Sequence, residues 1–284
     1  MLKNSEYENE LLKKGYLKVA LFSEEETDQL YRDSIKLIQQ IPKVFLKGFV
    51  SVGRIPDSRI RNLSTDLIRL HFLPRLQSLF EENYEFVSGV HLIKMPGLQG
   101  TLNIHQDSSM VDERNFTSVY AWMPLQRTNI LNGTLHVIPG SHLFGNVHRT
   151  LNIPNPFKAY IPPLKKFEVA LPVKKGEVVL FHSALMHSSP VNLSFFKRLA
   201  INCFIKPKAA PLVHYFLDEN TAAGKVDVFE ITPDFYYCED ILKRPDEHKY
   251  PYKGTETLAM PALGEGEFME LCKKFLDPLV KKKI

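Results

Sequence analysis

The chain has 284 residues, of which 44% are hydrophobic and 24% are charged, and its formal net charge is +4. A chain of this size can bury a large core, and one β domain over residues 1–284 is ordinary. The mild charge gives no broad basic surface of the kind that nucleic acids require, and no apolar run approaches the ~20 residues that span a bilayer. We therefore expect a single domain with neither nucleic acid nor a membrane as partner.

Cysteine content and the two chain ends bear on location. Cys203, Cys238 and Cys272 are odd in number and widely spaced, which argues against a disulfide framework and for a reducing compartment. The polar stretch Met1 to Glu6 has no apolar core of a secretory signal. The last residues, 281–284, form a basic tail and not a peroxisomal Ser-Lys-Leu address. We expect a cytoplasmic protein.

Helices are predicted first along the chain. Ser23 and Glu26 have the spacing of a capping box, and apolar residues at helical spacing follow up to Ile41. A second helical stretch runs from about Thr65 to Phe80, interrupted by Pro74. Residues 1–85 are therefore predicted to form a helical N-terminal part.

Short apolar strands come next, at residues 89–93, 118–122, 134–138, 177–181 and 199–205. Many short strands that carry a metal site predict a mainly β (α+β) fold. Its form is a double-stranded β-helix, the cupin-like jelly roll, with flanking N-terminal and C-terminal helices. We place the jelly-roll core at residues 86–215 and a C-terminal extension at 216–284.

Three further segments are candidates for substrate recognition. Residues 43–61 carry five basic side chains among apolar ones, which either hold an anionic group or are simply solvated. Residues 143–172, rich in proline and aromatic residues, form either a structured lid or a surface excursion. Residues 218–260 form a cover or a dimer contact, and the sequence does not decide between them.

The most informative motif is His105-Gln106-Asp107. On an extended strand, residues two apart point to the same side, so both side chains can reach one metal ion. His187 can supply a third ligand from another strand. This donor set suits non-haem Fe(II) and leaves one face of the ion open, whereas catalytic zinc is commonly tetrahedral. By itself, however, a His-x-Asp sequence more often belongs to a turn or a capped surface loop.

Arg198 strengthens the metal-site interpretation. It begins an apolar strand that ends near Phe204, and a buried arginine is costly unless an anion meets it. A planar guanidinium can hold a carboxylate through two parallel hydrogen bonds.

Residues 105–204 resemble the phytanoyl-CoA dioxygenase family of Fe(II)- and 2-oxoglutarate-dependent oxygenases. The likeness rests on the order and spacing of several segments: His105-Gln106-Asp107-Ser108, Ala121-Trp122-Met123, Asn132-Gly133-Thr134-Leu135, Pro139-Gly140-Ser141-His142, Phe181-His182, His187 and Arg198. Arg198 follows His187 by 198 − 187 = 11 residues, which is the spacing that the family shows.

The resemblance implies three catalytic iron ligands and three co-substrate residues: His105, Asp107 and His187, and Arg198, Ser189 and Trp122. Arg198 matches the partner of the C5 carboxylate of 2-oxoglutarate, Ser189 a hydroxyl that assists it, and Trp122 an aromatic wall of the pocket. The implied cofactor is Fe(II), with 2-oxoglutarate and O2 as co-substrates. Related halogenases lack the carboxylate found here at Asp107, so hydroxylation is favoured, while desaturation and cyclisation stay open.

The remaining histidines are interpreted as structural. His182 lies five residues before His187 and would face the opposite side of a continuous strand, so it is structural or contacts the pocket. His142 ends a turn and is expected to fix a loop, while His71 and His91 are expected to be packed in apolar surroundings. Four histidines have no partner that the sequence identifies: His136, His148, His214 and His248.

The sequence thus predicts an Fe(II)/2-oxoglutarate-dependent dioxygenase that hydroxylates a C–H bond of a small-molecule or lipid-like substrate and releases succinate and CO2. One alternative is a cupin-type metalloenzyme that does not use 2-oxoglutarate, although Arg198 then has no role. The other is a non-catalytic metal- or ligand-binding jelly roll. The substrate and the oligomeric state are not predicted.

Overall fold

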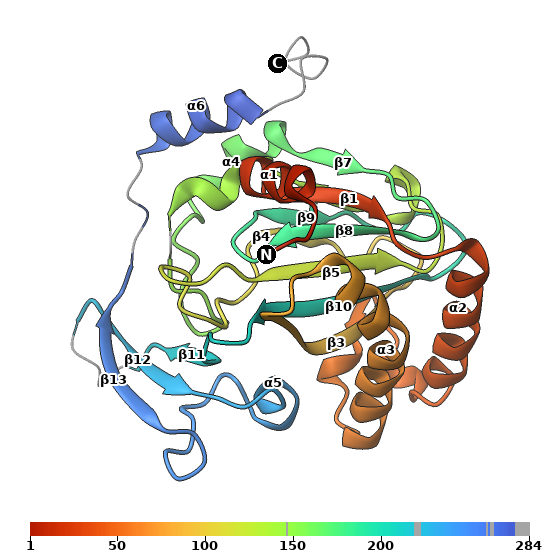
Figure 1. Ribbon diagram of the computed structural model, residues 1–284, viewed down its shortest axis with the longest axis horizontal. Coiled ribbons are helices and arrows are strands. Elements are labelled where there is room, and N and C mark those ends of the chain that lie inside the picture. Colours follow the sequence, from red (N-terminus) through yellow and green to blue (C-terminus); the bar gives the residue numbers. More distant parts are fainter. Residues whose placement is uncertain (146, 219–222, 260, 262–263, 276–284) are drawn as a thin grey trace.

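The fold is built on antiparallel sheets (Figure 1). The computed structural model describes residues 1–284 except 146, 219–222, 260, 262–263 and 276–284. A six-stranded sheet has the order β1-β8-β5-β10-β3-β2, and a four-stranded sheet has the order β4-β9-β6-β7. Their strands are β1 (Tyr16–Ala20), β2 (Phe49–Ser51), β3 (Tyr84–Lys94), β4 (Leu102–His105), β5 (Val119–Pro124), β6 (Leu135–Val137), β7 (Val169–Leu171), β8 (Glu177–His182), β9 (His187–Ser189) and β10 (Arg198–Pro207).

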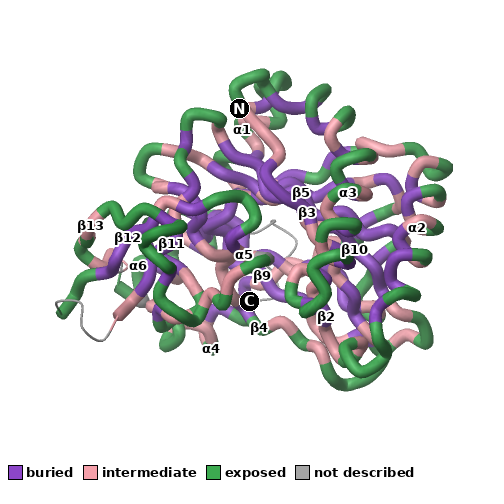
Figure 2. Tube along the Cα trace, turned by 90° about the horizontal axis from the view of Figure 1, so that it is seen from below, coloured by how far each residue is buried: buried purple, intermediate pink, exposed green. Residues whose placement is uncertain are grey.

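The two sheets enclose an apolar core. Trp122, Val179 and Ala200 of the six-stranded sheet cluster with Leu135 and Val137 of the four-stranded sheet. Because successive side chains of a strand point to opposite faces, the neighbours of Ala200 in β10 pack on the outer side instead. Figure 2 shows the buried residues concentrated in these central strands. The jelly roll predicted from the sequence is confirmed.

Helices α2 (Glu24–Ile38) and α3 (Ser58–Leu79) share a core with the outer face of the six-stranded sheet. The capping box of Ser23 and Glu26 is present, as expected. The second predicted helix is present, but its start and its interruption were predicted wrongly, because α3 begins seven residues before Thr65 and continues through Pro74. Pro74 has no N–H to donate to the Leu70 carbonyl, but Leu70 is 71% exposed, so we expect water to replace the missing donor.

The N-terminal part is not wholly helical, which corrects the division at residue 85. After α1 (Ser5–Lys14), strand β1 pairs with β8, and β2 pairs with β3. The signal in β1 is short: Leu17 and Val19 are buried, while Lys18 between them is exposed. Three alternating residues are too few to distinguish a strand from a loop by pattern alone.

The C-terminal extension carries a third, three-stranded sheet, visible below the sandwich in Figure 1. Its strands are β11 (Val213–Phe216), β12 (Lys225–Glu230) and β13 (Tyr252–Thr257), and α5 (Phe235–Cys238) lies between the last two. Because β11 pairs with β12, the proposed boundary at 215/216 cuts through this sheet.

Residues 143–172 are a structured excursion with a core of their own. They contain the second half of η4 (Ser141–Phe144), all of α4 (Ile161–Leu164) and η5 (Lys165–Phe167), and β7. Phe157 and Phe167 are fully buried together with Phe268 of α6 (Glu265–Phe275). Ile104 of β4 and Met186, which directly precedes β9, belong to the same cluster, so the excursion packs on the four-stranded sheet.

Among the helices of the described residues, none combines the length and apolarity that a membrane crossing needs. The predicted basic tail at 281–283 lies outside the described residues.

Candidate metal centre

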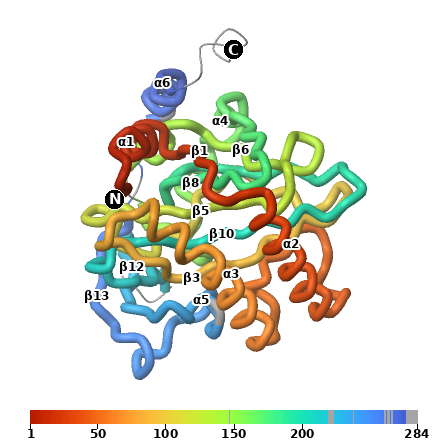
Figure 3. The backbone as a smooth tube through the Cα atoms, turned by 45° about the vertical axis from the view of Figure 1, so that its right-hand side comes forward, coloured from red at the N-terminus to blue at the C-terminus, as the bar shows by residue number. Residues whose placement is uncertain are grey.

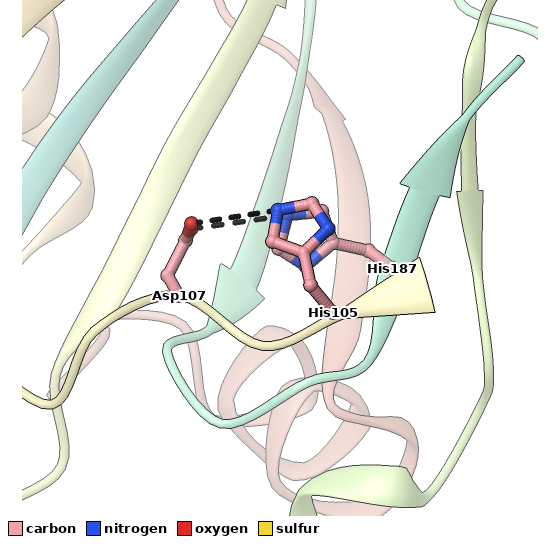
Figure 4. A group of neighbouring side chains, drawn as sticks. All are labelled: His105, Asp107 and His187. Carbon is pink, nitrogen blue, oxygen red and sulfur yellow. Dashed lines mark ion pairs between the residues drawn. The ribbon is translucent and has the colours of Figure 1, made fainter. Parts of the chain in front are cut away.

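His105, Asp107 and His187 converge on one point (Figure 4). His105 ends β4 and His187 begins β9, and the two residues are directly paired in register. Asp107 Oδ1 lies 3.9 Å from His105 Nε2, and Asp107 Oδ2 lies 3.9 Å from His187 Nε2. One ligand atom from each of the three residues lies within 4.8 Å of the other two.

Asp107 reaches this point from a loop and not from a strand, unlike the prediction. The partner strand β9 begins at His187, which already pairs with His105, so residues after His105 have no strand to pair with. The loop is instead held by hydrogen bonds to Arg149. The carbonyl of Asp107 accepts a hydrogen bond from Arg149 Nε at 2.8 Å, and Ser109 exchanges hydrogen bonds with the backbone of Arg149.

Arg149 is itself held by a buried carboxylate. Its guanidinium lies 2.6 Å from Glu113 Oε1, and the two side chains are only 6% and 3% exposed. Ser183 donates a further hydrogen bond to Glu113 Oε1 at 2.7 Å. Burial by itself raises the pKa of Glu113, but the Arg149 charge and these hydrogen bonds lower it below its usual value. The carboxylate therefore stays ionised and fixes the arginine behind Asp107.

Both imidazoles present a lone pair to the centre. His105 Nδ1 lies 2.7 Å from the Asn103 carbonyl, and His187 Nδ1 lies 2.9 Å from the Leu185 carbonyl. Because a carbonyl oxygen only accepts, we assign the N–H to Nδ1 in each ring, which leaves Nε2 free to bind a metal. Burial, with the nearby His105, lowers the pKa of His187 to about 4, so its ring is neutral at pH 7.

The residues present fit a divalent metal ion. Asp107 Oδ2 is buried without a hydrogen-bond partner among the described residues, which is costly unless a cation compensates it. The donor set of two imidazoles and one carboxylate is the one that non-haem Fe(II) prefers.

Two cations lie side by side further into the same sandwich. Arg198 of β10 and Lys94 of β3 are directly paired in register and almost fully buried. Arg198 Nε has no hydrogen-bond partner among the described residues, and the guanidinium carbon lies 5.3 Å from the Trp122 ring centroid. Burial lowers the pKa of Arg198 to about 10, and burial together with Arg198 lowers that of Lys94 to about 7. Such a pair calls for an anion.

A family comparison agrees with this arrangement. The family model described as phytanoyl-CoA dioxygenase (PhyH) matches residues 12–200, which is more than half of the chain. The chain belongs to this family.

Curated relatives of this PhyH-family chain match it over part of its length. A phytanoyl-CoA dioxygenase of Arabidopsis thaliana is 31% identical over 125 residues, covering 42% of this chain and 43% of the relative. Phytanoyl-CoA dioxygenase domain-containing protein 1 of Danio rerio is 30% identical over 138 residues, covering 44% and 47%. The chain thus spans about half the length of the curated relatives it matches.

Solved structures share the fold of this PhyH-family chain at low identity. EvdO2 from Micromonospora carbonacea var. aurantiaca, solved with 2-oxoglutarate, has a TM-score of 0.54 and 20% identity over 74% of this chain and 93% of its own. The non-heme α-ketoglutarate-dependent epimerase SnoN from nogalamycin biosynthesis has a TM-score of 0.53 and 16% identity over 92% and 93%.

The other predicted pocket residues of this PhyH-family chain are close to the cations. Trp122 lies beside Arg198, as described above. Ser189 is buried on β9, but its hydroxyl proton is used in a hydrogen bond to the Gly133 carbonyl at 2.9 Å. To donate to a bound carboxylate, Ser189 must first release that carbonyl.

Sequence reasoning missed two residues of this region. Lys94 ends the apolar strand that was predicted at 89–93, so a charge directly after an apolar run was an available signal. Asn202 lies four residues after Arg198, on the same face of β10, and its Oδ1 is buried without a partner among the described residues. A polar residue inside an apolar strand was the signal here.

The secondary histidines lie outside the metal centre. His182 accepts a hydrogen bond from the Ala184 backbone, and His142 Nε2 lies 2.9 Å from the Leu12 carbonyl, which ties its turn to α1 as expected. His91 is buried, but between the hydroxyls of Ser34 and Ser64 and not in purely apolar surroundings.

The prediction that His71 packs in apolar surroundings was wrong. Two histidines for which the sequence identified no partner, His148 and His214, have one in the structure. His71 is partly exposed and lies 4.0 Å from Asp33. His148 lies 3.4 Å from Glu256, and His214 lies 3.2 Å from the Tyr236 hydroxyl. The periodicity around these residues did not reveal polar neighbours from distant segments.

Two of the three arginines of segment 43–61 have partners within the chain. Arg61 donates to the carbonyls of Ile55 and Pro56, and Arg59 donates to Gln40. Both arginines therefore have partners without an anionic ligand.

Proposed function

We propose that this chain is an Fe(II)- and 2-oxoglutarate-dependent oxygenase. The observation that carries the proposal is the convergence of His105, Asp107 and His187, with one carboxylate oxygen left without a partner among the described residues. Membership of the phytanoyl-CoA dioxygenase family supports the same chemistry.

In this proposal the chain's residues bind and orient two ligands. The two Nε2 atoms and the Asp107 carboxylate hold the metal. Ser189, two residues after His187 on β9, accepts a hydrogen bond from Lys94 Nζ on its carbonyl at 2.7 Å. The cations thus lie about 7 Å along the strand from the metal ligand, comparable with the length of a five-carbon diacid. Arg198 and Lys94 would then hold the far carboxylate of 2-oxoglutarate against Trp122.

Asp107 is the residue that bears on the reaction outcome. When bound, iron with 2-oxoglutarate and O2 supplies the oxidation that yields succinate and CO2. Asp107 fills the position that halogenases leave open, which supports hydroxylation of a C–H bond. The solved neighbours include an epimerase and a carbocyclase, so the shared fold by itself does not select the outcome. A small-molecule or lipid-like substrate remains our proposal.

Anaerobic titration tests the assignment. Adding Fe(II) and 2-oxoglutarate together should produce a visible charge-transfer band that neither produces alone, and admitting O2 should release succinate slowly even without substrate. His187→Ala should abolish metal uptake measured by elemental analysis. His182→Asn, which changes another imidazole, a partly buried one five residues before His187, should retain it.

Three outcomes would contradict the proposal in different ways. Metal uptake without the band or succinate would indicate a metalloenzyme that does not use 2-oxoglutarate. Binding of both ligands without turnover under O2 would indicate a binding protein. Metal uptake retained in His187→Ala would move the metal site elsewhere.

A further inference from the structure

Large hydrophobic side chains gather on one exposed end of the molecule. Of the 16 that are exposed among the described residues, eight lie in four loops. We call this surface the apolar tip, and its residues are Val44, Phe45, Leu98, Ile130, Leu131, Leu193, Phe195 and Phe196.

The four loops adjoin the same end of the six-stranded sheet. β3 and β5 end there and β2 and β10 begin there, since Lys94 pairs with both Phe49 and Arg198. Backbone hydrogen bonds join the loops in sequence: Met95 N to Gly48 O at 2.8 Å, Gly97 N to Asn192 O at 2.8 Å, and Leu193 N to Leu131 O at 2.7 Å. Figure 3 shows the loop between β9 and β10 projecting from this end. The apolar tip is therefore one surface.

Phe195 and Phe196 are held outward by a turn that side-chain hydrogen bonds stabilise. They are 94% and 78% exposed. Asn192, which is fully buried, donates to the carbonyls of Lys94 and Phe196 and accepts from the backbone and hydroxyl of Ser194. The two phenyl rings are thus presented to solvent by an ordered loop.

Ile130 and Leu131 are presented in the same way. They are 65% and 62% exposed, in the single turn η3 (Ile130–Asn132). Asn129 and Asn132 brace this turn as a reciprocal capping box. Folded monomers rarely expose a contiguous apolar surface of this kind unless something binds it.

The charges of the four loops indicate which kind of partner would bind the apolar tip. Segments 43–48, 95–100, 126–132 and 190–197 contain Lys43, Lys47, Arg127 and Lys197 but no aspartate or glutamate. A symmetric dimer through the tip would bring these four cations against their own copies, which disfavours a second copy of the chain. Apolar side chains that enter a lipid layer beside cations that meet its headgroups suit an anionic membrane surface.

We propose that the apolar tip docks this protein peripherally on an anionic lipid surface. This revises the expectation from the sequence that no membrane is a partner, and it needs no membrane-spanning helix. The proposal is independent of the proposed chemistry, because every residue of the tip lies outside the metal centre.

Vesicle sedimentation tests the docking. The full chain should co-sediment with vesicles of phosphatidylcholine containing phosphatidylserine, and more weakly with phosphatidylcholine alone or at high salt. The double variant Phe195→Ser/Phe196→Ser should lower the bound fraction at least about tenfold. Leu70→Ser is the matched control, since Leu70 is 71% exposed on α3, away from the tip, and should leave binding unchanged.

Size-exclusion chromatography with light scattering tests whether the apolar tip instead binds a second copy of the chain. Without vesicles, the wild-type chain and the double variant should have the same mass, and their thermal unfolding should coincide because the replaced rings are exposed. A wild-type dimer that the double variant converts to monomer would overturn the proposal in favour of a self-association face. Absence of vesicle binding with no change in mass would overturn it as well.

Discussion

At the scale of single residues, Arg198 is a buried charge whose nearest cross-strand neighbour, Lys94, is another cation. Replacing Arg198 with methionine of similar length removes a desolvated charge, and within the described part of the chain its Nε has no hydrogen bond to lose. We expect Arg198→Met to raise the free energy of unfolding of the ligand-free protein by about 1–2 kcal/mol. Urea unfolding in a chelator measures this.

The same variant should bind 2-oxoglutarate more weakly, by about 2–5 kcal/mol, because the ligand's carboxylate loses its buried partner. Calorimetric titration with the metal present measures the affinity. Trp122→Phe is the control, since it keeps an aromatic wall beside Arg198 and should change the affinity less. If Arg198→Met left the affinity unchanged, the assigned role of Arg198 would be wrong.

The site residues differ in how far the sequence could identify them. His105, Asp107, His187 and Arg198 were recognisable by motif and spacing. Lys94 was not, because its role depends on which strand pairs with β3, and that pairing joins residues about a hundred positions apart. Sequence spacing reports neighbours along the chain, whereas a buried pair across strands reports the topology.

At the scale of elements, the Asp107 loop depends on Arg149 and Glu113. Arg149→Met should remove the bond to the Asp107 carbonyl and leave a buried carboxylate unpaired, lowering stability by about 3–5 kcal/mol. It should also weaken metal affinity on the order of 10-fold, as loss of a supporting contact does. Urea unfolding and titration with Co(II) measure the two effects.

The double variant Arg149→Met/Glu113→Gln separates the two effects. It removes the unpaired charge and leaves an amide that can still accept from Ser183. Stability should therefore recover in large part, while Co(II) affinity stays low because the Asp107 carbonyl still lacks its donor. Recovery of both quantities together would show that Arg149 acts only on stability and not on the position of Asp107.

The elements show where local patterns were sufficient. The capping box placed the start of α2 correctly, because a cap is made by residues adjacent in sequence. The start of α3 was missed although Asp57 caps it, since the apolar periodicity before Thr65 is weak. The short edge strands β1 and β2 are fixed by pairing with β8 and β3, which a single sequence does not reveal.

At the scale of the whole molecule, the fold buries histidines in several separate places. Burial lowers the pKa of His91 to about 3, and those of His182, His187 and His214 to about 4. All four rings are neutral in the folded state, whereas in the unfolded chain they take up protons near their ordinary pKa of 6.5. The unfolded state therefore binds more protons as the pH falls below 6.5.

This linkage predicts acid unfolding of the metal-free protein. A depressed folded pKa contributes stability that is fully present above pH 6.5 and is lost as the pH falls toward 4. Each group should lower the free energy of unfolding by about 1.4 kcal/mol per pH unit in that window. Urea unfolding at intervals from pH 7.5 to 5 in a chelator measures the slope.

His91→Gln isolates one contribution to this slope. A glutamine amide can still bond both Ser34 and Ser64, but it does not titrate. The slope should fall by one group's share, ~1.4 kcal/mol per pH unit. This effect does not depend on the metal centre, because His91 lies in the core that faces the helices. The variant removes a ring that takes up a proton in the unfolded state but not in the folded state, so it must reduce the difference in bound protons between the two states. An unchanged slope would therefore mean that the acid sensitivity arises elsewhere.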